Sequence, residues 1–534
     1  MPLLSTHQLS YELNDGRTLF NNLTVSLTRK RTAIVGKNGA GKSLLAALLC
    51  GNITPTQGHI TRTSNIGYFT QLPDECSPSA SITIGDFLEI SDVLEALDKI
   101  ASGHYESVLF DIIGDNWNAH NDVTEKLRAI DLPLNPALTV SKLSGGEYTK
   151  LQLLKLFEQN PGLLILDEPS NHLDEGGKQW LVDKIKQFEG AILLVSHDRI
   201  LLNEMEEIWE IEDQTLHLYG GNYNAYKKQK TAQHEALRRQ ISALQQQTKH
   251  LEKQAQQNYE KAQQRASTGN RLRKNGSQAK VLLDKKRDNA TKAASARNKN
   301  ERARAAHITQ NKQQLLQQAS QKSLIDKPLR FYLNDQLNHK SQANNKTAFS
   351  LENVILSYGT QQPLSLSINA HQKLQVGGKN GSGKSTLLKT LHGNLHAHAG
   401  RLSINTSTAY LDQHFSLLHN KTTALENLMT QCPTLLLSEA RTLMASAGLH
   451  RDTAMQSVAT LSGGQKMKLA MLIVSNQRQQ PFLLLDEPDN HLDIESKSVL
   501  AHAIKHYLGG ILLVSHDSDF MIDCKITRAI YLEK

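Results

Sequence analysis

Short runs of consecutive apolar residues occur at matching places in two distant parts of the chain. Leu163–Leu166 and Phe482–Leu485 are such runs, and two acidic residues follow each of them directly. Apolar runs of this length without alternation predict strands that are buried on both faces, as in a parallel sheet. A further apolar strand is predicted before each of two Ser-His-Asp sequences. The pattern indicates α/β domains, in which ligands bind beyond the carboxyl ends of the strands.

Between these parts, apolar residues are sparse and recur at helical spacing, which predicts long helices. Leu237, Ile241, Leu244 and Leu251 follow this spacing, and no proline occurs between residues 227 and 312. The apolar stripe is as narrow as a coiled-coil seam. Ala266–Ser277 contains two glycines and small polar residues, which predict a bend. We therefore expect an outgoing helix, a basic tip and a returning helix, each arm with about 35 residues and about 50 Å long.

The distribution of charge separates this middle region from its flanks. The 534 residues carry a formal charge of +8, yet residues 227–312 hold 22 Lys and Arg against 6 Asp and Glu. The rest of the chain is acidic, so the positive charge marks the insert. Its only aromatic residue is Tyr259, which favours contacts with phosphate backbones and nucleic-acid shape over base stacking. Charge alone does not separate RNA from DNA, so DNA is not excluded, and a solvated helical face is the alternative.

Length and composition narrow the class of protein. A chain of 534 residues favours more than one domain, and 39% hydrophobic residues is an ordinary value for folded protein. No apolar run approaches the roughly 18–20 residues that cross a bilayer, and the first residues do not resemble a signal peptide. The four cysteines are scattered without a CxxC pair, which disfavours a disulfide framework or a cysteine zinc site. We therefore expect a cytoplasmic protein with several domains.

The two flanks repeat each other, which predicts two homologous domains over residues 1–226 and 348–534, joined by a linker over 227–347. About 24 additional residues lie between Gln71 and Leu143 in the first half. They predict either a short projecting arm or a larger helical subdomain. The repeated segments keep their order: Gly36–Ser43 with Gly378–Ser385, Leu143–Glu147 with Leu461–Gln465, Leu163–Asp174 with Phe482–Asp493, and Leu194–Asp198 with Leu513–Asp517.

Each repeated motif contains residue types suited to phosphate chemistry. In Gly-x-x-x-x-Gly-Lys-Ser, the glycines allow backbone N–H groups to wrap a phosphate chain, and the lysine and serine reach the terminal phosphates and Mg²⁺. The acid pair at the strand end supplies one Mg²⁺ ligand and one carboxylate that polarises the attacking water. A histidine after the next strand can contact the γ-phosphate. The residues concerned are Lys42, Lys384, Ser43, Ser385, Asp167, Asp486, Glu168, Glu487, His197 and His516.

Two further features are weaker signals when each is considered alone. Leu-Ser-Gly-Gly before a helix predicts a second anion site at a helix N-terminus, although by itself it is as well explained as a turn with a helix cap. Tyr11 and Tyr358 precede the two phosphate loops. Either tyrosine fits adenine stacking or a strand edge.

Taken together, these motifs resemble an ATP-binding-cassette ATPase that is present twice. The set includes the phosphate loops, Gln71 and Gln413, the Leu-Ser-Gly-Gly signatures, the Asp-Glu-Pro boxes and Ser-His-Asp. The paired Asn-His-Leu-Asp endings, the Tyr219–Tyr226 stretch and the charged linker are similar to the ABC-F class. That resemblance implies ATP hydrolysis with Mg²⁺ and a linker that contacts rRNA and tRNA on the ribosome. Members of the class are translation factors or antibiotic-resistance ribosome-protection factors.

The resemblance also implies two head-to-tail composite sites within one chain, with Asp174 and Asp493 linking them across the interface. Catalytic roles fall on Glu168, Glu487, His197 and His516. Mg²⁺ ligands would be Ser43, Asp167, Gln71, Ser385, Asp486 and Gln413. The ATP-binding residues implied for the site with the first phosphate loop are Tyr11, Gly36, Lys37, Asn38, Gly39, Ala40, Gly41, Lys42, Ser43 and Gln71, completed by Ser462, Gly463 and Gly464. Those implied for the other site are Tyr358, Gly378, Lys379, Asn380, Gly381, Ser382, Gly383, Lys384, Ser385 and Gln413, completed by Ser144, Gly145 and Gly146.

Departures from the family pattern are small, and two other functions stay open. Lys150 and Lys468 replace an arginine that is frequent after the signature, and Asp489 occupies the place where Ser170 stands in the first half. Neither departure removes a catalytic group, so both sites are expected to hydrolyse ATP. The alternatives are the ATPase subunit of a membrane transporter, which gives the basic linker no evident role, and a DNA-associated repair ATPase.

Overall fold

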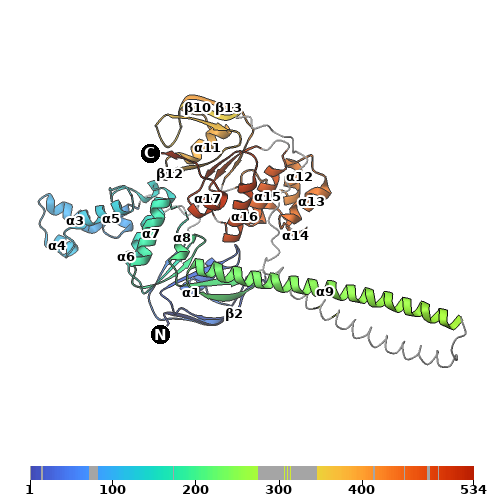
Figure 1. Ribbon diagram of the computed structural model, residues 1–534. Coiled ribbons are helices and arrows are strands. Elements are labelled where there is room, and N and C mark those ends of the chain that lie inside the picture. The colour runs from blue at the N-terminus through green and yellow to red at the C-terminus, as the bar shows by residue number, and fades with distance from the viewer. Residues whose placement is uncertain are drawn as a thin grey trace. The chain divides into compact units, whose positions relative to one another are not determined.

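The computed structural model describes most of the two flanks and the first part of the linker. The residues described are 2–13, 16–70, 82–171, 173–274, 306, 310, 313, 346–412, 415–449, 451–477, 481–490 and 492–533. These residues form two compact units (Figure 1). One unit comprises Met1–Asn224 with Lys327–Lys534 and so contains both repeated halves, and the other comprises Ala225–Asp326.

The first half contains a six-stranded sheet in the order β5-β6-β7-β3-β8-β9. Its strands are parallel except for β9, which pairs antiparallel with β8. The central strands β6 and β7 are buried along their whole length, as the uninterrupted apolar runs predict. A separate antiparallel sheet has the order β2-β1-β4. The strands are β1 (Leu4–Glu12), β2 (Thr18–Ser26), β3 (Arg31–Gly36), β4 (Gln57–Arg62), β5 (Ile66–Phe69), β6 (Leu163–Asp167), β7 (Ala191–Val195), β8 (Glu207–Glu212) and β9 (Thr215–Gly220).

The helices of the first half either follow a parallel strand or lie between β5 and β6. The additional residues of this half form α3 and α4, which pack together around Ala96, Leu109 and Ile113. The predicted helical addition is therefore present, and a role as an arm stays a prediction. The helices are α1 (Lys42–Cys50), α2 (Ile84–Phe87), α3 (Ser91–Ala101), α4 (Ser107–Ile113), α5 (Ala119–Ala129), α6 (Gly145–Glu158), α7 (Glu175–Gln187) and α8 (Arg199–Asn203), with a 3₁₀ turn at Val140–Lys142.

The second half repeats this architecture with a five-stranded parallel sheet, β14-β15-β16-β12-β17, and an antiparallel sheet, β11-β10-β13. The predicted α/β fold class with two phosphate-loop domains is confirmed. The strands are β10 (Thr347–Ile355), β11 (Leu364–Asn369), β12 (Lys373–Gly378), β13 (Ala399–Ile404), β14 (Thr408–Leu411), β15 (Phe482–Asp486), β16 (Ile511–Val514) and β17 (Ala529–Leu532). The helices are α11 (Lys384–His392), α12 (Ala424–Gln431), α13 (Leu437–Ser446), α14 (Arg451–Ala454), α15 (Gly463–Ser475), α16 (Ile494–His506) and α17 (Ser518–Cys524), with a 3₁₀ turn at Val458–Thr460.

The outgoing arm of the linker is a single helix of 52 residues, α9 (Tyr223–Lys274) (Figure 1). The bend expected from Ala266 onward was placed too early, because the helix continues through Gly269 to Lys274. One glycine costs only about 1 kcal/mol relative to alanine, which a long helix of good helix formers tolerates. Leu237, Ile241 and Leu244 are half-buried among exposed neighbours, in agreement with the predicted apolar stripe, and coiled-coil pairing stays a prediction. Ala306, Gln310 and Gln313 are helical, and the rest of the returning arm lies outside the described residues.

Among the helices that the structure describes, none combines the length and the apolar character needed to span a bilayer.

Candidate functional site

Each phosphate loop leaves the carboxyl end of the sheet strand that precedes its helix, β3 before α1 and β12 before α11. The ammonium group of Lys42 donates hydrogen bonds to the carbonyls of Gly36 and Lys37, at 3.0 and 3.1 Å. Lys384 makes the corresponding bonds to its own loop, at 2.8 and 3.2 Å. The loop therefore curls around its own lysine. Burial lowers the pKa of Lys42, and Glu168 opposes that shift.

Glycine is required in these loops for conformation and for space. Gly39 and Gly381 have φ of +81° and +79°, in the left-handed region that other residues rarely adopt. A Cβ atom on Gly36 would lie 2.8 Å from the carbonyl oxygen of Ile211 on β8. The loop can therefore pass close to the sheet only without a side chain at Gly36, with its backbone following the path that wraps a phosphate chain.

The aspartates of the two Asp-Glu-Pro boxes are buried where β6 and β15 end. In the second half, Asp486 accepts hydrogen bonds from the hydroxyl of Ser385 at 3.1 Å and from that of Tyr410 at 2.8 Å. In the first half, Oδ1 of Asp167 is buried and has no hydrogen-bond partner among the described residues. An orphaned carboxylate oxygen beside a serine hydroxyl is a donor set that fits Mg²⁺, a cation that prefers oxygen ligands.

Tyr410 is a site residue that the motif reasoning missed. Its hydroxyl is buried and donates a hydrogen bond to Asp486. Burial raises the pKa of Tyr410, and the neighbouring carboxylate of Asp486 raises this pKa further. The equivalent residue in the first half is Tyr68, whose pKa is also raised by burial. The signal was present in the sequence, since a tyrosine stands three positions before each expected glutamine, Gln71 and Gln413. Both glutamines lie outside the described residues.

Glu168 and Glu487 follow the two strand ends and share an unusual backbone conformation, with φ of +49° at each. This left-handed conformation is sparsely populated by residues other than glycine and is often found at functional sites. The main-chain nitrogens of these glutamates donate to Val195 and Val514 on the neighbouring strands, at 2.8 and 3.0 Å. The strained turn is therefore held in place by the sheet.

Each of these glutamates faces the histidine of the adjacent Ser-His-Asp sequence. The distance from Oε1 of Glu168 to Nε2 of His197 is 3.8 Å, and the corresponding distance from Glu487 to His516 is 3.6 Å. Burial raises the pKa of Glu168 to about 7, opposed chiefly by Lys42. Burial also lowers the pKa of His197 well below its ordinary value and that of His516 to about 4. Both histidines are therefore neutral at pH 7 in this state.

The signature serines cap helices, as the cautious reading of the sequence expects. Ser144 and Ser462 each form a capping box at the start of α6 and α15, closed by Glu147 and Gln465 respectively. In the first half, the hydroxyl of Ser144 also donates to Glu147 at 2.8 Å. These caps place serine and glycine groups at an N-terminal helix end, where an anion is electrostatically favoured.

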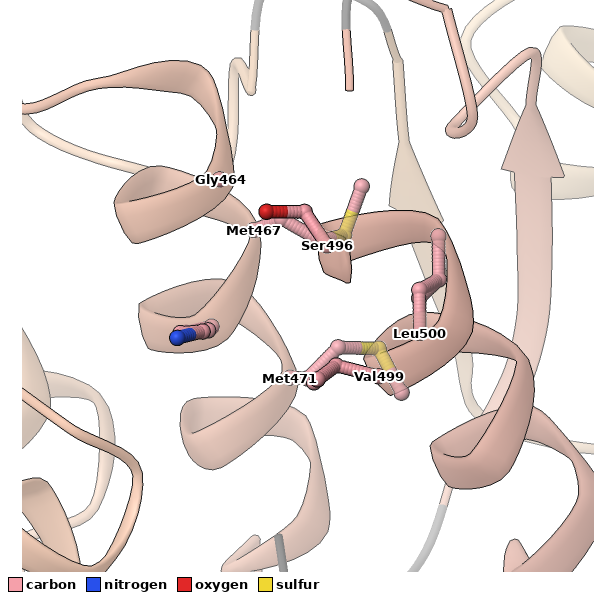
Figure 2. A pocket seen from close by; sticks show the side chains of 7 residues that line it. Gly464, Met467, Met471, Ser496, Val499 and Leu500 are labelled. Atoms are coloured by element: carbon pink, nitrogen blue, oxygen red, sulfur yellow. The ribbon is translucent and has the colours of Figure 1, made fainter. Parts of the chain in front are cut away.

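The second signature helix packs closely on the helix that follows the Asp-Glu-Pro box. Figure 2 shows Gly464 and Met467 of α15 facing Ser496 of α16. A Cβ atom on Gly464 would lie 2.6 Å from Oγ of Ser496, so the contact requires glycine or a movement of the serine. Oδ1 of Asp493 caps α16 through the main-chain nitrogen of Ser496, at 2.8 Å. The signature and the Asp493 loop are therefore parts of one packed element.

Contacts between the halves bring this element to the first phosphate loop. Oδ2 of Asp493 accepts a hydrogen bond from the main-chain nitrogen of Asn38 at 2.9 Å. Lys37 pairs with Glu495 at 3.5 Å. The first phosphate loop therefore lies against the second half of the chain.

The second phosphate loop contacts the first half. Lys379 pairs with Asp131 at 2.9 Å. Burial lowers the pKa of Lys384, and the carboxylate of Asp174 is among the charges that oppose this shift. Asp174 itself is paired with Lys150 at 3.3 Å within its own half. Each phosphate loop is therefore contacted by the opposite half of the chain, and the residues that make these contacts differ between the two loops.

The two tyrosines expected at the adenine lie in different environments. Tyr11 is on β1 and packs partly buried against the core of the first half. Tyr358 lies in the loop after β10 and is 69% exposed. β1 is the central strand of its sheet, and Tyr358 is the more accessible of the two rings. Adenine stacking stays a prediction for both.

Comparison with known proteins agrees with this arrangement. A family profile described as ABC transporter matches residues 20–171 and 361–490. The Bacillus subtilis (strain 168) protein named "Putative ATP-binding protein YdiF" is 31% identical, over 98% of this chain and 78% of its own length. The ribosome protection protein VmlR of the same organism is 28% identical, over 97% of this chain and 85% of its own length.

A solved structure shares the fold across both halves. It is the archaeal ribosome recycling factor aABCE1 in complex with the ribosomal stalk protein aP1, with a TM-score of 0.55 and 16% identity over 98% of this chain and 87% of that one. At this identity the likeness concerns the fold alone. With the profile match in both halves, the relatives along nearly the full length and the paired phosphate loops, the chain belongs to the ATP-binding-cassette family, as a tandem-cassette ATPase of the ABC-F class.

Proposed function

We propose that the protein hydrolyses ATP at two composite sites and uses the closure of its cassettes to dock the basic linker against ribosomal RNA and tRNA. The observation that carries the ribosome part of this proposal is α9. It is a continuous helix with 12 Lys and Arg against 3 Asp and Glu. A positively charged helix without a row of aromatic residues suits contacts with RNA phosphates.

The names of similar proteins support the same partner. One relative along nearly the whole chain is a ribosome protection protein, and the solved structure with the same fold is a ribosome recycling factor. The basic linker has no evident role in a transporter subunit. A DNA partner is chemically compatible with α9, and the experiment below includes it as an outcome.

The proposed site roles come from the family resemblance, and contacts among the described residues support them. The first phosphate loop, Gly36–Ser43, would hold the phosphates of one ATP, with Ser462, Gly463 and Gly464 closing over it from the other half. Gly378–Ser385 would hold the second ATP, closed by Ser144, Gly145 and Gly146. The contacts of Asn38 with Asp493 and of Lys379 with Asp131 support this head-to-tail assignment.

Mg²⁺ would be held by Asp167 and Ser43 in one site and by Asp486 and Ser385 in the other, and it would neutralise charge on the terminal phosphates. In each site the glutamate after that aspartate orients the attacking water. The distances of 3.8 and 3.6 Å from Glu168 and Glu487 to the histidines support this role. The neutral His197 and His516 would donate to the γ-phosphate. Gln71 and Gln413 are proposed as further ligands on the basis of sequence.

The position of each lysine inside its phosphate loop also suggests a first step of ATP binding. The ammonium groups of Lys42 and Lys384 are held by loop carbonyls. An incoming phosphate chain offers a stronger, charge-assisted partner, so we expect each lysine to leave the carbonyls and contact the phosphates when ATP binds.

Pelleting with purified ribosomes tests the proposal. The double variant Glu168→Gln with Glu487→Gln should bind ATP without hydrolysing it and sediment with ribosomes only when ATP is present. The double variant Lys42→Ala with Lys384→Ala should not sediment under either condition. Absence of ATP-dependent sedimentation of the first variant would contradict the ribosome part of the proposal.

A pair of matched charge variants tests the linker. Arg271, Arg273 and Lys274 are changed together to Gln at the far end of α9, and Lys227, Lys228 and Lys230 are changed together near its start. Both sets remove three positive charges. The far set should weaken ribosome binding more while leaving ATPase activity without ribosomes unchanged. Stimulation of ATPase activity by duplex or branched DNA, and not by ribosomes, would favour the DNA alternative.

A further inference from the structure

A small polar cavity of about 30 Å³ lies where the two halves meet. Residues of both halves line it, among them Glu168, His197 and Lys178 from the first and Asp489, Lys497 and His516 from the second. The volume suffices for a water molecule but not for a nucleotide. The cavity is therefore a meeting point of the two catalytic regions and not a further substrate site.

Two equivalent lysines, four positions after the capping aspartates of α7 and α16, reach into this region. Nζ of Lys178 lies 2.8 Å from Oδ2 of Asp198, the aspartate of the Ser-His-Asp sequence in its own half. The same ammonium group donates to the main-chain oxygen of His516 in the opposite half, at 3.2 Å. Lys178 thus joins the two histidine loops directly.

Lys497 repeats the first of these contacts. Its Nζ lies 2.8 Å from Oδ2 of Asp517 in its own half. Its charge also acts across the interface on Glu168 and His197, which line the same cavity. Each lysine is therefore anchored by its own cassette and faces the catalytic pair of the other.

The burial of these four charges is costly unless they remain together. The side chains of Lys178, Asp198, Lys497 and Asp517 are each at most 12% exposed. Separating buried ionic partners leaves an uncompensated charge, whereas apolar replacement of a whole pair is often neutral for stability. An arrangement of this kind is therefore better explained by fixing the register of two surfaces than by stability alone.

We propose that Lys178 and Lys497 are positioning residues that hold each histidine loop in register with the opposite cassette and thereby couple the two ATP sites. Lys178 positions His516 beside Glu487. Lys497 positions the pair of Glu168 and His197. The proposal depends on ATP hydrolysis but not on the ribosome.

One substitution between the repeats makes the link asymmetric. Asp489 replaces the equivalent Ser170 and accepts a hydrogen bond from the hydroxyl of Ser515 at 3.0 Å. Its other oxygen has no hydrogen-bond partner among the described residues. Lys497 therefore lies near two carboxylates of its own half, Asp489 and Asp517. Lys178 pairs with Asp198 of its own half and donates to the His516 carbonyl of the opposite half. Of the two lysines, Lys178 therefore contacts the other cassette more directly.

Single-site ATPase measurements test this coupling. Glu168→Gln leaves only the site of Glu487 active, and Glu487→Gln leaves only that of Glu168. In the first background, Lys178→Met should lower kcat by about 5-fold or more with KM for ATP nearly unchanged. In the second background, the same change should lower kcat by a smaller factor, because Lys178 contacts the main chain of only the opposite histidine, His516. Lys497→Met should show the reverse preference.

Matched controls separate positioning from damage to the fold. Lys186→Met on α7 and Lys505→Met on α16 remove a lysine from the same helices away from the cavity, and neither should alter kcat. Lys178→Arg keeps the charge and should restore part of the lost rate. Equal loss in both backgrounds, or no loss in either, would overturn the proposal. Absence of ATPase activity from the unmutated chain would contradict the proposed hydrolysis itself, so the two failures are distinguished.

Discussion

The main-chain nitrogen of Asn38 donates a hydrogen bond of 2.9 Å to Oδ2 of Asp493, which lies 455 positions later in the chain. The other oxygen of that carboxylate caps α16 through the nitrogen of Ser496. One side chain therefore fixes the start of a helix in one cassette and the backbone of a phosphate loop in the other.

Replacement of Asp493 should affect the first phosphate loop selectively. With Glu487→Gln present, so that only the site of Glu168 is active, Asp493→Ala should lower kcat/KM for ATP about 10-fold or more, because a charged acceptor is lost. Asp493→Asn keeps an oxygen acceptor and should retain part of the activity. Steady-state ATPase assays measure both.

The equivalent Asp174 provides the comparison, because it pairs with Lys150 in its own half. In the same background, Asp174→Ala should have a smaller effect on the site of Glu168. A larger effect of Asp174 than of Asp493 would contradict the assignment of the first phosphate loop to Asp493.

The raised pKa of Glu168 predicts a pH dependence of ATP hydrolysis. Burial raises this pKa to about 7, and only the ionised carboxylate can orient and polarise water as a base. With Glu487→Gln present, kcat should therefore rise about 10-fold between pH 6 and pH 8. A profile that is flat over this range would show that Glu168 does not titrate there with ATP bound.

Asp489 predicts that stability depends on pH in a particular direction. Burial raises its pKa to about 6, against an ordinary value of 3.8. The folded chain retains a proton that the unfolded chain releases between these values, so the free energy of unfolding falls as pH rises through this window. Asp489→Asn removes this loss and should be stabilising at pH 7.5. Its advantage should be about 1–1.5 kcal/mol larger at pH 7.5 than at pH 5.

Urea denaturation at the two pH values measures this difference. Ser170→Asn at the equivalent position introduces an amide without removing an ionisable group, so its effect should not change with pH. An advantage of Asp489→Asn that is the same at pH 5 and pH 7.5 would count against the buried carboxyl as its source.

Salt should separate the two activities of the chain. The positive charges of α9 are exposed or half-buried at the positions described, and binding to RNA phosphates releases counterions. Raising monovalent salt from 50 to 200 mM should weaken ribosome binding by at least about 100-fold. Nucleotide binding in the phosphate loops uses closely spaced groups, among them the buried Lys42 and Lys384, and should change much less. Equilibrium sedimentation and nucleotide titration measure the two affinities, and a parallel decline of both would contradict this division.

The fold was largely predictable because each repeat contains short motifs that mark where its strands and phosphate loops lie. The apolar runs before Asp167 and Asp486 became buried parallel strands, and the phosphate-loop glycines adopt conformations that few other residues tolerate. The bend of the linker was not predictable to the residue. Gly269 is compatible with a turn and with a helix interior, and the surrounding helix formers decide between them.

The site residues that the sequence motifs did not indicate depend on tertiary contacts. Tyr410 is marked only by its place three positions before Gln413. Lys178 and Lys497 act at a cavity lined by both halves, and no local pattern marks them. The exchange of Ser170 for Asp489 was visible as a departure from the repeat. Its importance depends on burial and on the nearby Lys497, neither of which the sequence shows.

The root of α9 gives the long helix a mechanical property. Tyr223 is buried and hydrogen-bonded to Arg199, which pairs with Asp523 of the other cassette at 2.7 Å. From this root an unbroken helix of 52 residues extends about 78 Å at 1.5 Å per residue. Over that length a tilt of about 5° at the root displaces the far end by about 7 Å. A tilt that changes the ATP sites very little would therefore displace the far end of α9 by about the size of a nucleotide.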